Sequence, residues 1–103
     1  MQDLKEIISR INEIKKEIQD LGDLRSGSLT KQYGDPKNQK RAFYQINYTQ
    51  KGKFKTDYVK KEFVDEMKKQ TEEYKKLKDL TNEWIELGII KSKLQMKTKK
   101  VME

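Results

Sequence analysis

The chain has 103 residues, of which 33% are hydrophobic and 40% charged, and it carries a formal net charge of +7. This length gives room for one small domain. The sequence has neither cysteine nor histidine, which excludes disulfides, thiolate metal sites and catalysis by cysteine or histidine. No segment approaches the roughly 18 consecutive apolar residues of a membrane span. We therefore expect a cytoplasmic protein without a metal, a cofactor, a membrane contact or an enzymatic activity.

The positive charge is concentrated in the middle of the chain. Residues 25–61 hold ten basic and two acidic side chains, whereas residues 1–24 and 62–90 are net negative. Residues 91–103 are net positive again. Such segregation indicates a surface for phosphate groups or another acidic partner, because an evenly mixed surface would serve only solubility.

The N-terminal segment predicts an amphipathic helix over residues 3–22. Its apolar residues recur at alternating spacings of three and four, the a/d pattern of a coiled coil. Gly22 would take the left-handed position that ends the helix. The stripe consists of Leu4, Ile7, Ile11, Ile14, Ile18 and Leu21. An isoleucine stripe of this size needs a partner, which is either another helix of the same chain or a second copy.

A second helix is predicted over residues 62–87, ending where Gly88 weakens the pattern. Its apolar residues are Phe63, Met67, Tyr74, Leu77, Leu80, Trp84 and Leu87. We expect it to lie antiparallel to the first helix, with residues 91–103 as a basic extension that is either a frayed helix end or a disordered arm. Because the first helix is shorter, the Trp84 end would be left uncovered, which favours a homodimer. The predicted oligomer interface is Leu4, Ile7, Ile11, Ile14, Ile18 and Trp84.

Residues 28–59, between the helices, predict a three-stranded antiparallel meander. The strands are expected at 28–33, 42–49 and 53–59, with a turn-rich loop at 34–41. The predicted fold is therefore α+β: a coiled-coil-like helix, the meander, and a long C-terminal helix packed antiparallel on the first. Residues 1–90 would form a single domain.

The loop between the second and third strands decides which side chains share a face. A three-residue loop ending at Gly52 pairs Tyr48 with Phe54, whereas a two-residue loop pairs Tyr48 with Lys55. The first register collects the apolar side chains on one side and is therefore preferred. That side, Tyr44, Ile46, Tyr48, Phe54 and Tyr58, is expected to be sheet core on the helices rather than a stacking surface for bases.

The opposite side then predicts a basic face that contacts the phosphate backbone of DNA or RNA. Lysines would supply charge, and Gln45 and Asn47 would reach base edges. The candidate residues are Lys37, Lys40, Arg41, Gln45, Asn47, Lys51, Lys53 and Lys55. Two alternatives remain: a solvated basic surface without function, and a protein-interaction, scaffold or inhibitor module that acts through the coiled-coil helices.

Residues 20–90 resemble a family of small uncharacterised prokaryotic proteins, a domain of unknown function. The resemblance is carried by an R-x-G-S-L…Y segment, an aromatic strand, a G-K turn, a strand ending Y-V and a long charged helix. The matching residues are Arg25, Gly27, Ser28, Leu29, Tyr33, Phe43–Tyr48, Gly52, Lys53, Tyr58, Val59 and Glu62–Leu87. Where many members have a cysteine-rich loop, this chain has GDPKNQKR, which offers no metal ligand of that kind. The resemblance implies the architecture and no activity.

Overall fold

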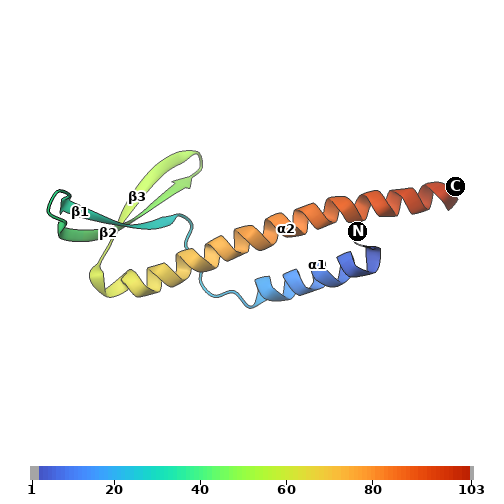
Figure 1. Cartoon of the computed structure of the whole chain (residues 1–103), viewed down its shortest axis with the longest axis horizontal. Coiled ribbons are helices and arrows are strands. Elements are labelled where there is room, and N and C mark those ends of the chain that lie inside the picture. Colours follow the sequence, from blue (N-terminus) through green and yellow to red (C-terminus); the bar gives the residue numbers. More distant parts are fainter. Residues whose placement is uncertain (1–2, 103) are drawn as a thin grey trace. The chain divides into compact units, whose positions relative to one another are not determined.

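The computed structural model describes residues 3–102 of the chain, with side chains up to Lys97. Along the chain, one helix precedes and one follows a three-stranded antiparallel sheet with strand order β1-β2-β3, so the predicted α+β fold and meander are confirmed (Figure 1). The elements are α1 (Leu4–Gln19), β1 (Ser28–Asp35), β2 (Lys40–Gln50), β3 (Lys53–Val59), a 3₁₀ turn (Lys61–Phe63) and α2 (Val64–Met102).

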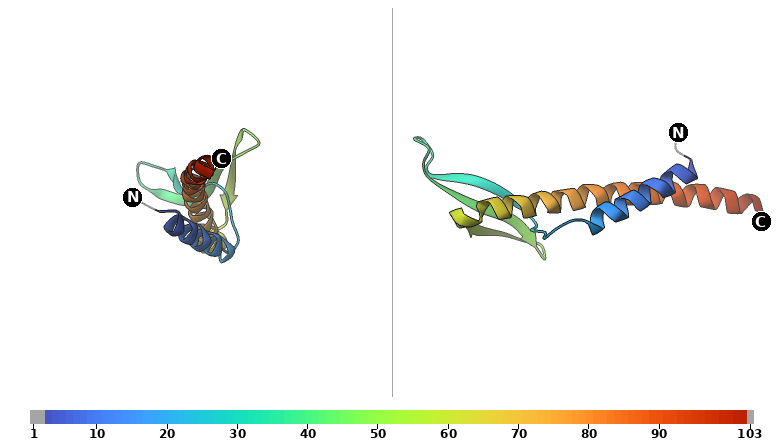
Figure 2. Two further views of the ribbon diagram at one scale, coloured as in Figure 1. Left: turned by 90° about the vertical axis from the view of Figure 1, so that its right-hand side faces the viewer. Right: turned by 90° about the horizontal axis from the view of Figure 1, so that it is seen from below.

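The chain forms two compact units. The helical unit comprises residues 1–21 and 77–103, and the sheet unit comprises residues 22–76, so α2 contributes to both (Figure 2). The expectation of one domain over residues 1–90 stays a prediction.

Helix α1 is slightly shorter than its pattern predicted. Asp3 caps its N-terminus, where the side chain accepts a hydrogen bond of 2.8 Å from the backbone N–H of Glu6. The helix ends at Gln19, followed by Asp20 in a right-handed conformation. The expected left-handed cap at Gly22 is therefore wrong.

Helix α2 is much longer than its pattern predicted. It runs without interruption through Gly88 to Met102, so the expected end at Leu87 is wrong and residues 91–102 are helical. A glycine in a helix interior costs only about 1 kcal/mol relative to alanine. The neighbouring Glu, Leu, Ile and Lys residues supply enough helix propensity for the helix to continue past it.

The core of the helical unit lies between α1 and the C-terminal part of α2, which run antiparallel (Figure 1). Ile7, Ile11 and Ile14 are buried there against Leu80 and Leu87. The flanking apolar side chains are Ile18, Trp84 and Leu94. Ile7, Ile11 and Ile14 are covered by their own chain, and their part in the predicted oligomer interface stays a prediction. For Leu4, Ile18 and Trp84, the interface role stays a prediction.

One ion pair joins the two helices of the helical unit. Arg10 donates from Nε and Nη2 to the two carboxylate oxygens of Glu83, at 2.6 and 2.8 Å. These two hydrogen bonds hold the pKa of the Glu83 carboxyl below its usual value. The ionised form of Glu83 is therefore favoured by folding.

This ion pair gives a first testable prediction. Because the pKa of Glu83 is lower in the folded chain, its contribution to stability is present above the unfolded value of about 4.5 and is lost as the pH falls through the folded value. Between about pH 6 and about pH 3, the urea midpoint of the wild type should fall further than that of Glu83→Gln. The exposed Glu72→Gln should follow the wild type; equal pH dependence in all three proteins would contradict the assignment.

The register of the β2–β3 hairpin differs from the predicted one. Tyr48 pairs with Lys55, Thr49 with Phe54, and Gln50 with Lys53. The connection is thus the two-residue turn Lys51–Gly52, in which both residues have positive φ, 51° and 79°. This is the type I′ geometry, whose twist matches that of the strands. The preferred three-residue loop was wrong, because burying all the apolar residues on one side is not what decides the pairing.

In the observed register, each side chain of β3 lies on the opposite face of the sheet from the one predicted. Phe54 and Tyr58 now lie on the same side as Gln45 and Asn47, away from Ile46. The predicted core set Tyr44, Ile46, Tyr48, Phe54 and Tyr58 is therefore split between the two faces of the sheet.

Within residues 3–102, no helix combines the length and the apolar character needed to span a membrane.

Candidate functional site

One face of the sheet is packed against the start of α2. Ile46 is buried at its centre with 1% of its surface exposed, and Tyr44 and Tyr48 beside it are half-buried. The backbone N–H of Arg25 donates to the carbonyl oxygen of Gln70 in α2 at 3.1 Å. We call this the helix-side face.

Arg25 contacts side chains of two strands on the helix-side face. Its guanidinium lies 4.5 Å from the centre of the Tyr48 ring and donates to the Asp57 carboxylate at 2.5 Å. The Tyr48 hydroxyl also donates to Asp57, at 3.5 Å. The hydrogen bond from Arg25 keeps the pKa of Asp57 below its usual value, so this carboxylate remains ionised at neutral pH. The arginine of the R-x-G-S-L segment thus links Tyr48 of β2 to Asp57 of β3.

The glycine of the same segment lets the chain pass close to β2. Gly27 has a φ of 113°, a conformation that is available almost only to glycine. A Cβ at this position would lie 2.5 Å from the carbonyl oxygen of Asn47 and 2.9 Å from side-chain carbons of Ile46 and Tyr48. The segment therefore has room for no other residue at this point.

The opposite face of the sheet contains mainly aromatic and uncharged polar side chains, with Arg41 at the end next to the β1–β2 connection, where a Cβ on Gly34 would lie 3.2 Å from the Arg41 Cβ. By the observed pairing, its members are Ser28, Thr30, Gln32, Phe43, Gln45, Asn47, Thr49, Phe54, Thr56 and Tyr58. We call it the aromatic face. Phe54 and Tyr58 expose 73% and 78% of their surfaces. Phe43 lies against Tyr58 with ring centroids 5.8 Å apart and the planes tilted by 55°. The large rings of Phe54 and Tyr58 are therefore not part of a core within the chain.

Hydrogen bonds connect several polar side chains of the aromatic face. Thr56 Oγ1 donates to Asn47 Oδ1 at 2.9 Å, and Gln45 Nε2 donates to the same oxygen at 3.4 Å. On β1, Gln32 Nε2 donates to Thr30 Oγ1 at 3.4 Å. Because the carbonyl end of the Asn47 amide receives both bonds, its NH₂ group stays available as a donor to a ligand.

The predicted site residues do not share one face. Gln45 and Asn47 lie on the aromatic face, as expected, but Lys53 and Lys55 belong to the helix-side face by the observed pairing. Lys55 donates from Nζ to Gln50 Oε1 at 3.0 Å, and Lys51 lies in the turn. The expectation that lysines and amides form one basic face is therefore wrong, because the two-residue turn places the side chains of Lys53 and Lys55 on the opposite side from Gln45 and Asn47.

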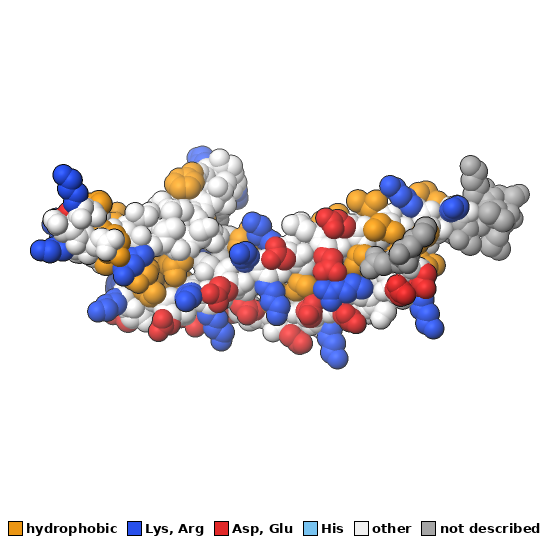
Figure 3. All heavy atoms as spheres, in the orientation of Figure 1, with side chains coloured by type: hydrophobic (Ala, Val, Ile, Leu, Met, Phe, Trp, Pro, Cys, Tyr) orange, Lys and Arg blue, Asp and Glu red, His pale blue; other side chains and the backbone are white. Residues whose placement is uncertain are grey.

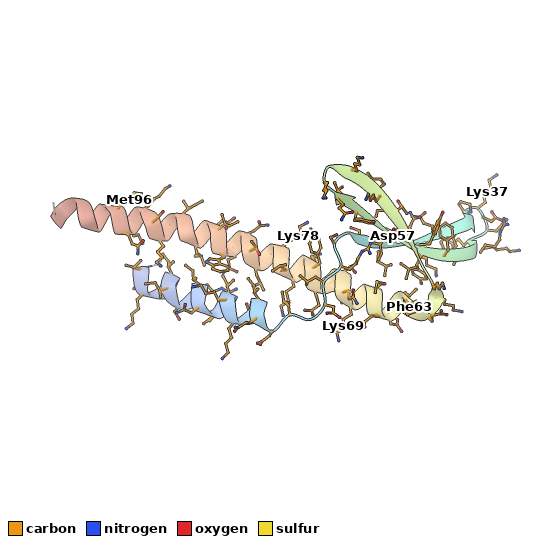
Figure 4. All side chains as sticks on the ribbon, turned by 180° about the vertical axis from the view of Figure 1, so that it is seen from behind. Lys37, Asp57, Phe63, Lys69, Lys78 and Met96 are labelled. Atoms are coloured by element: carbon orange, nitrogen blue, oxygen red, sulfur yellow. The ribbon has the colours of Figure 1, made fainter. Side chains whose placement is uncertain are left out.

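The basic residues instead gather at the two ends of the sheet. Lys37, Lys40 and Arg41 lie in or beside the β1–β2 connection, and Lys51 and Lys53 lie at the β2–β3 turn (Figures 3 and 4). The two connections are at opposite ends of β2, whose 11 residues span about 35 Å. The rings and amides of the aromatic face therefore lie between two basic ends.

Phe43, Phe54 and Tyr58 are the candidate residues that sequence reasoning missed. The signal that could have found them is the Lys51–Gly52 pair, because a glycine after a residue at positive φ is typical of a two-residue hairpin turn. That turn alone sets the register and thereby places Phe54 and Tyr58 on the outside.

The site offers no obvious place for a metal ion. Among the residues that the structure describes, no group of three or more acidic side chains lies close enough together to hold one. The chemistry available at the aromatic face is stacking on the rings and hydrogen bonding to amides and hydroxyls.

Comparison with known proteins identifies one family. The family model described as a domain of unknown function, DUF6788, matches residues 4–69, which cover α1, the whole sheet and the first residues of α2. Neither the search of curated proteins nor that of solved structures found a match. The sheet and its two faces thus lie within the matched part of the chain.

Proposed function

The chain belongs to the DUF6788 family, a domain of unknown function whose description names no activity, so we propose its function from the geometry of the sheet. We propose a non-enzymatic protein that binds single-stranded nucleic acid on the aromatic face. The observation that carries the proposal is the pair of exposed rings on β3, Phe54 and Tyr58, the second of which lies beside Phe43.

Exposed rings favour unpaired bases as the ligand. Stacking of a base on an aromatic side chain contributes about 1–3 kcal/mol per base and tolerates any sequence, because every base has a flat face. In a duplex those faces are covered by neighbouring bases, so rings on an open sheet have little to gain from it. Duplex DNA or RNA is therefore the weaker ligand in this proposal.

The charge at the two ends of the sheet favours a nucleic acid over other ligands of an aromatic face. Residues 25–61 hold ten basic and two acidic side chains, and five of the basic ones lie at the ends of β2. A strand laid along β2 would meet Lys37, Lys40 and Arg41 at one end and Lys51, in the turn, at the other. These residues would contact phosphates, and the bases between them would lie over the rings.

The amides of the aromatic face supply hydrogen bonds to bases. The free NH₂ group of Asn47 and the amide of Gln45 lie on the strand next to Phe54 and Tyr58. An amide can pair with donor and acceptor atoms on a base edge. We expect them to add a modest base preference to binding that stacking and charge provide. Lys55 is assigned no direct contact, because it is bonded to Gln50 on the other face.

Fluorescence polarisation with labelled oligonucleotides tests the proposal. We expect saturable binding to mixed-sequence single-stranded DNA and RNA, with an affinity at least about tenfold higher than for a duplex of the same length. The affinity should weaken as the salt concentration is raised. In a plot of the logarithm of the association constant against the logarithm of the salt concentration, we expect a slope of about −0.7 for each phosphate contacted. The absence of single-strand binding at low salt and tens of micromolar protein would refute the proposal. Equal or tighter binding to the duplex would refute the stacking surface.

A further inference from the structure

The apolar residues of α2 lie on two faces of the helix instead of one. Leu80, Leu87 and their neighbours face α1 in the core of the helical unit. Ile85, Ile89 and Met96 expose 57%, 51% and 62% of their surfaces. With about 3.6 residues per turn, these three project from nearly the opposite side of α2. Figure 4 shows Met96 on the side of α2 that points away from α1.

The exposed residues have the spacing of a helix-pairing seam. Ile85, Ile89, Ser92 and Met96 follow one another at intervals of four, three and four, the a/d pattern of a coiled coil. We call these four residues the second seam. In the helical unit all four residues are exposed, whereas Ile7, Ile11 and Ile14 of the α1 stripe are buried within the chain.

Gly88 beside the second seam has no use within the chain. A Cβ at Gly88 would meet nothing within 4 Å, and its backbone has no positive φ. Internal packing would therefore accept alanine there, which favours the helix by about 1 kcal/mol. A glycine next to Ser92 would let the backbone of another helix approach closely.

We propose that two copies of this chain associate through the second seam, with their α2 helices antiparallel across a twofold axis. Ile85 of each copy then faces Met96 of the other, and Ile89 faces Ser92. This surface replaces Ile7, Ile11 and Ile14, which are buried within one chain, as the place where a homodimer forms.

Charge complementarity selects both the partner and the orientation. Glu86 and Lys93 are exposed and flank the second seam on one side, seven residues apart. In the antiparallel arrangement, Glu86 of each copy lies beside Lys93 of the other, which gives two ion pairs. In a parallel arrangement, each would face Thr81, Gly88 or Gln95 instead. The seam is thus complementary to itself in one orientation only.

Sedimentation velocity from low micromolar to about 1 mM protein tests self-association, because a seam this short suits a weak dimer. The wild type should shift from monomer towards dimer. Ile89→Lys should remain monomeric, whereas Ile90→Lys, which changes the neighbouring isoleucine outside the seam, should behave as the wild type. Circular dichroism checks that both variants stay helical. A wild type that is monomeric throughout, or equal weakening by both variants, would overturn the proposal.

A charge exchange tests the orientation. Glu86→Lys alone and Lys93→Glu alone should each weaken self-association at least about tenfold, because each places like charges across the axis. A mixture of the two variants should form heterodimers, and the double variant Glu86→Lys with Lys93→Glu should recover the wild-type affinity. If neither the mixture nor the double variant recovers it, the antiparallel pairing is wrong.

Discussion

Replacement of Gly27 by alanine should destabilise the sheet unit more than any other single methyl addition at a glycine of this chain. The φ of 113° at Gly27 costs a residue with a Cβ about 1–3 kcal/mol in the backbone alone. The added carbon would also lie 2.5 Å from the carbonyl oxygen of Asn47, which belongs to β2 and cannot move without breaking the sheet. The expected result is a chain whose sheet is partly unfolded at room temperature.

Urea unfolding followed by circular dichroism measures the effect, and the chain offers a matched control. A Cβ at Gly22 would meet nothing within 4 Å, and Gly22 has no positive φ. Gly22→Ala should therefore leave the midpoint unchanged or raise it slightly. If Gly27→Ala has the same midpoint as Gly22→Ala, the close approach of the R-x-G-S-L segment to β2 is wrong.

The second large effect is expected on binding. Replacing both Phe54 and Tyr58 by alanine removes two exposed rings, and the loss of two stacked bases should weaken single-strand binding at least about 30-fold. Both side chains are more than two-thirds exposed, so the variant should fold as the wild type does. Polarisation titrations against one oligonucleotide give the ratio of the dissociation constants.

The salt dependence separates stacking from charge. The double alanine variant should bind weakly at every salt concentration with an unchanged slope, because no phosphate contact is lost. Lys37→Gln with Lys40→Gln should instead make the slope shallower. Phe63→Ala, which removes an exposed ring outside the aromatic face, should bind as the wild type, and Tyr58→Phe should retain most of the affinity. An equal loss in Phe63→Ala would show that the aromatic face has no special role.

The helices and the meander could be predicted because their signals are periodic. The α1 stripe, including Ile7, Ile11 and Ile14, recurs with helical spacing and is buried as such a stripe should be. The end of α2 could not be predicted from Gly88, because the cost of one glycine, about 1 kcal/mol, is too small to end a helix of this length. Local propensity decides such ends only when the neighbouring residues are also poor helix formers.

The candidate site could not be predicted, because it depends on one residue of register. Sorting the aromatic residues into a core is a sound rule for a sheet that has nothing to bind, and it selects the wrong loop here. The observed sheet leaves Phe54 and Tyr58 in water and places Lys55 on the helix side. The rule therefore fails at the residues for which we propose a binding function.

Two-dimensional NMR of the labelled protein, titrated with an unlabelled single-stranded oligonucleotide, tests the central claim most directly. We expect the ring resonances of Phe43, Phe54 and Tyr58 and the side-chain amides of Gln45 and Asn47 to shift together, while Tyr48 on the helix-side face stays in place. Shifts confined to the lysines, with unchanged rings, would contradict the stacking surface. The absence of any shift at saturating oligonucleotide would contradict nucleic-acid binding itself.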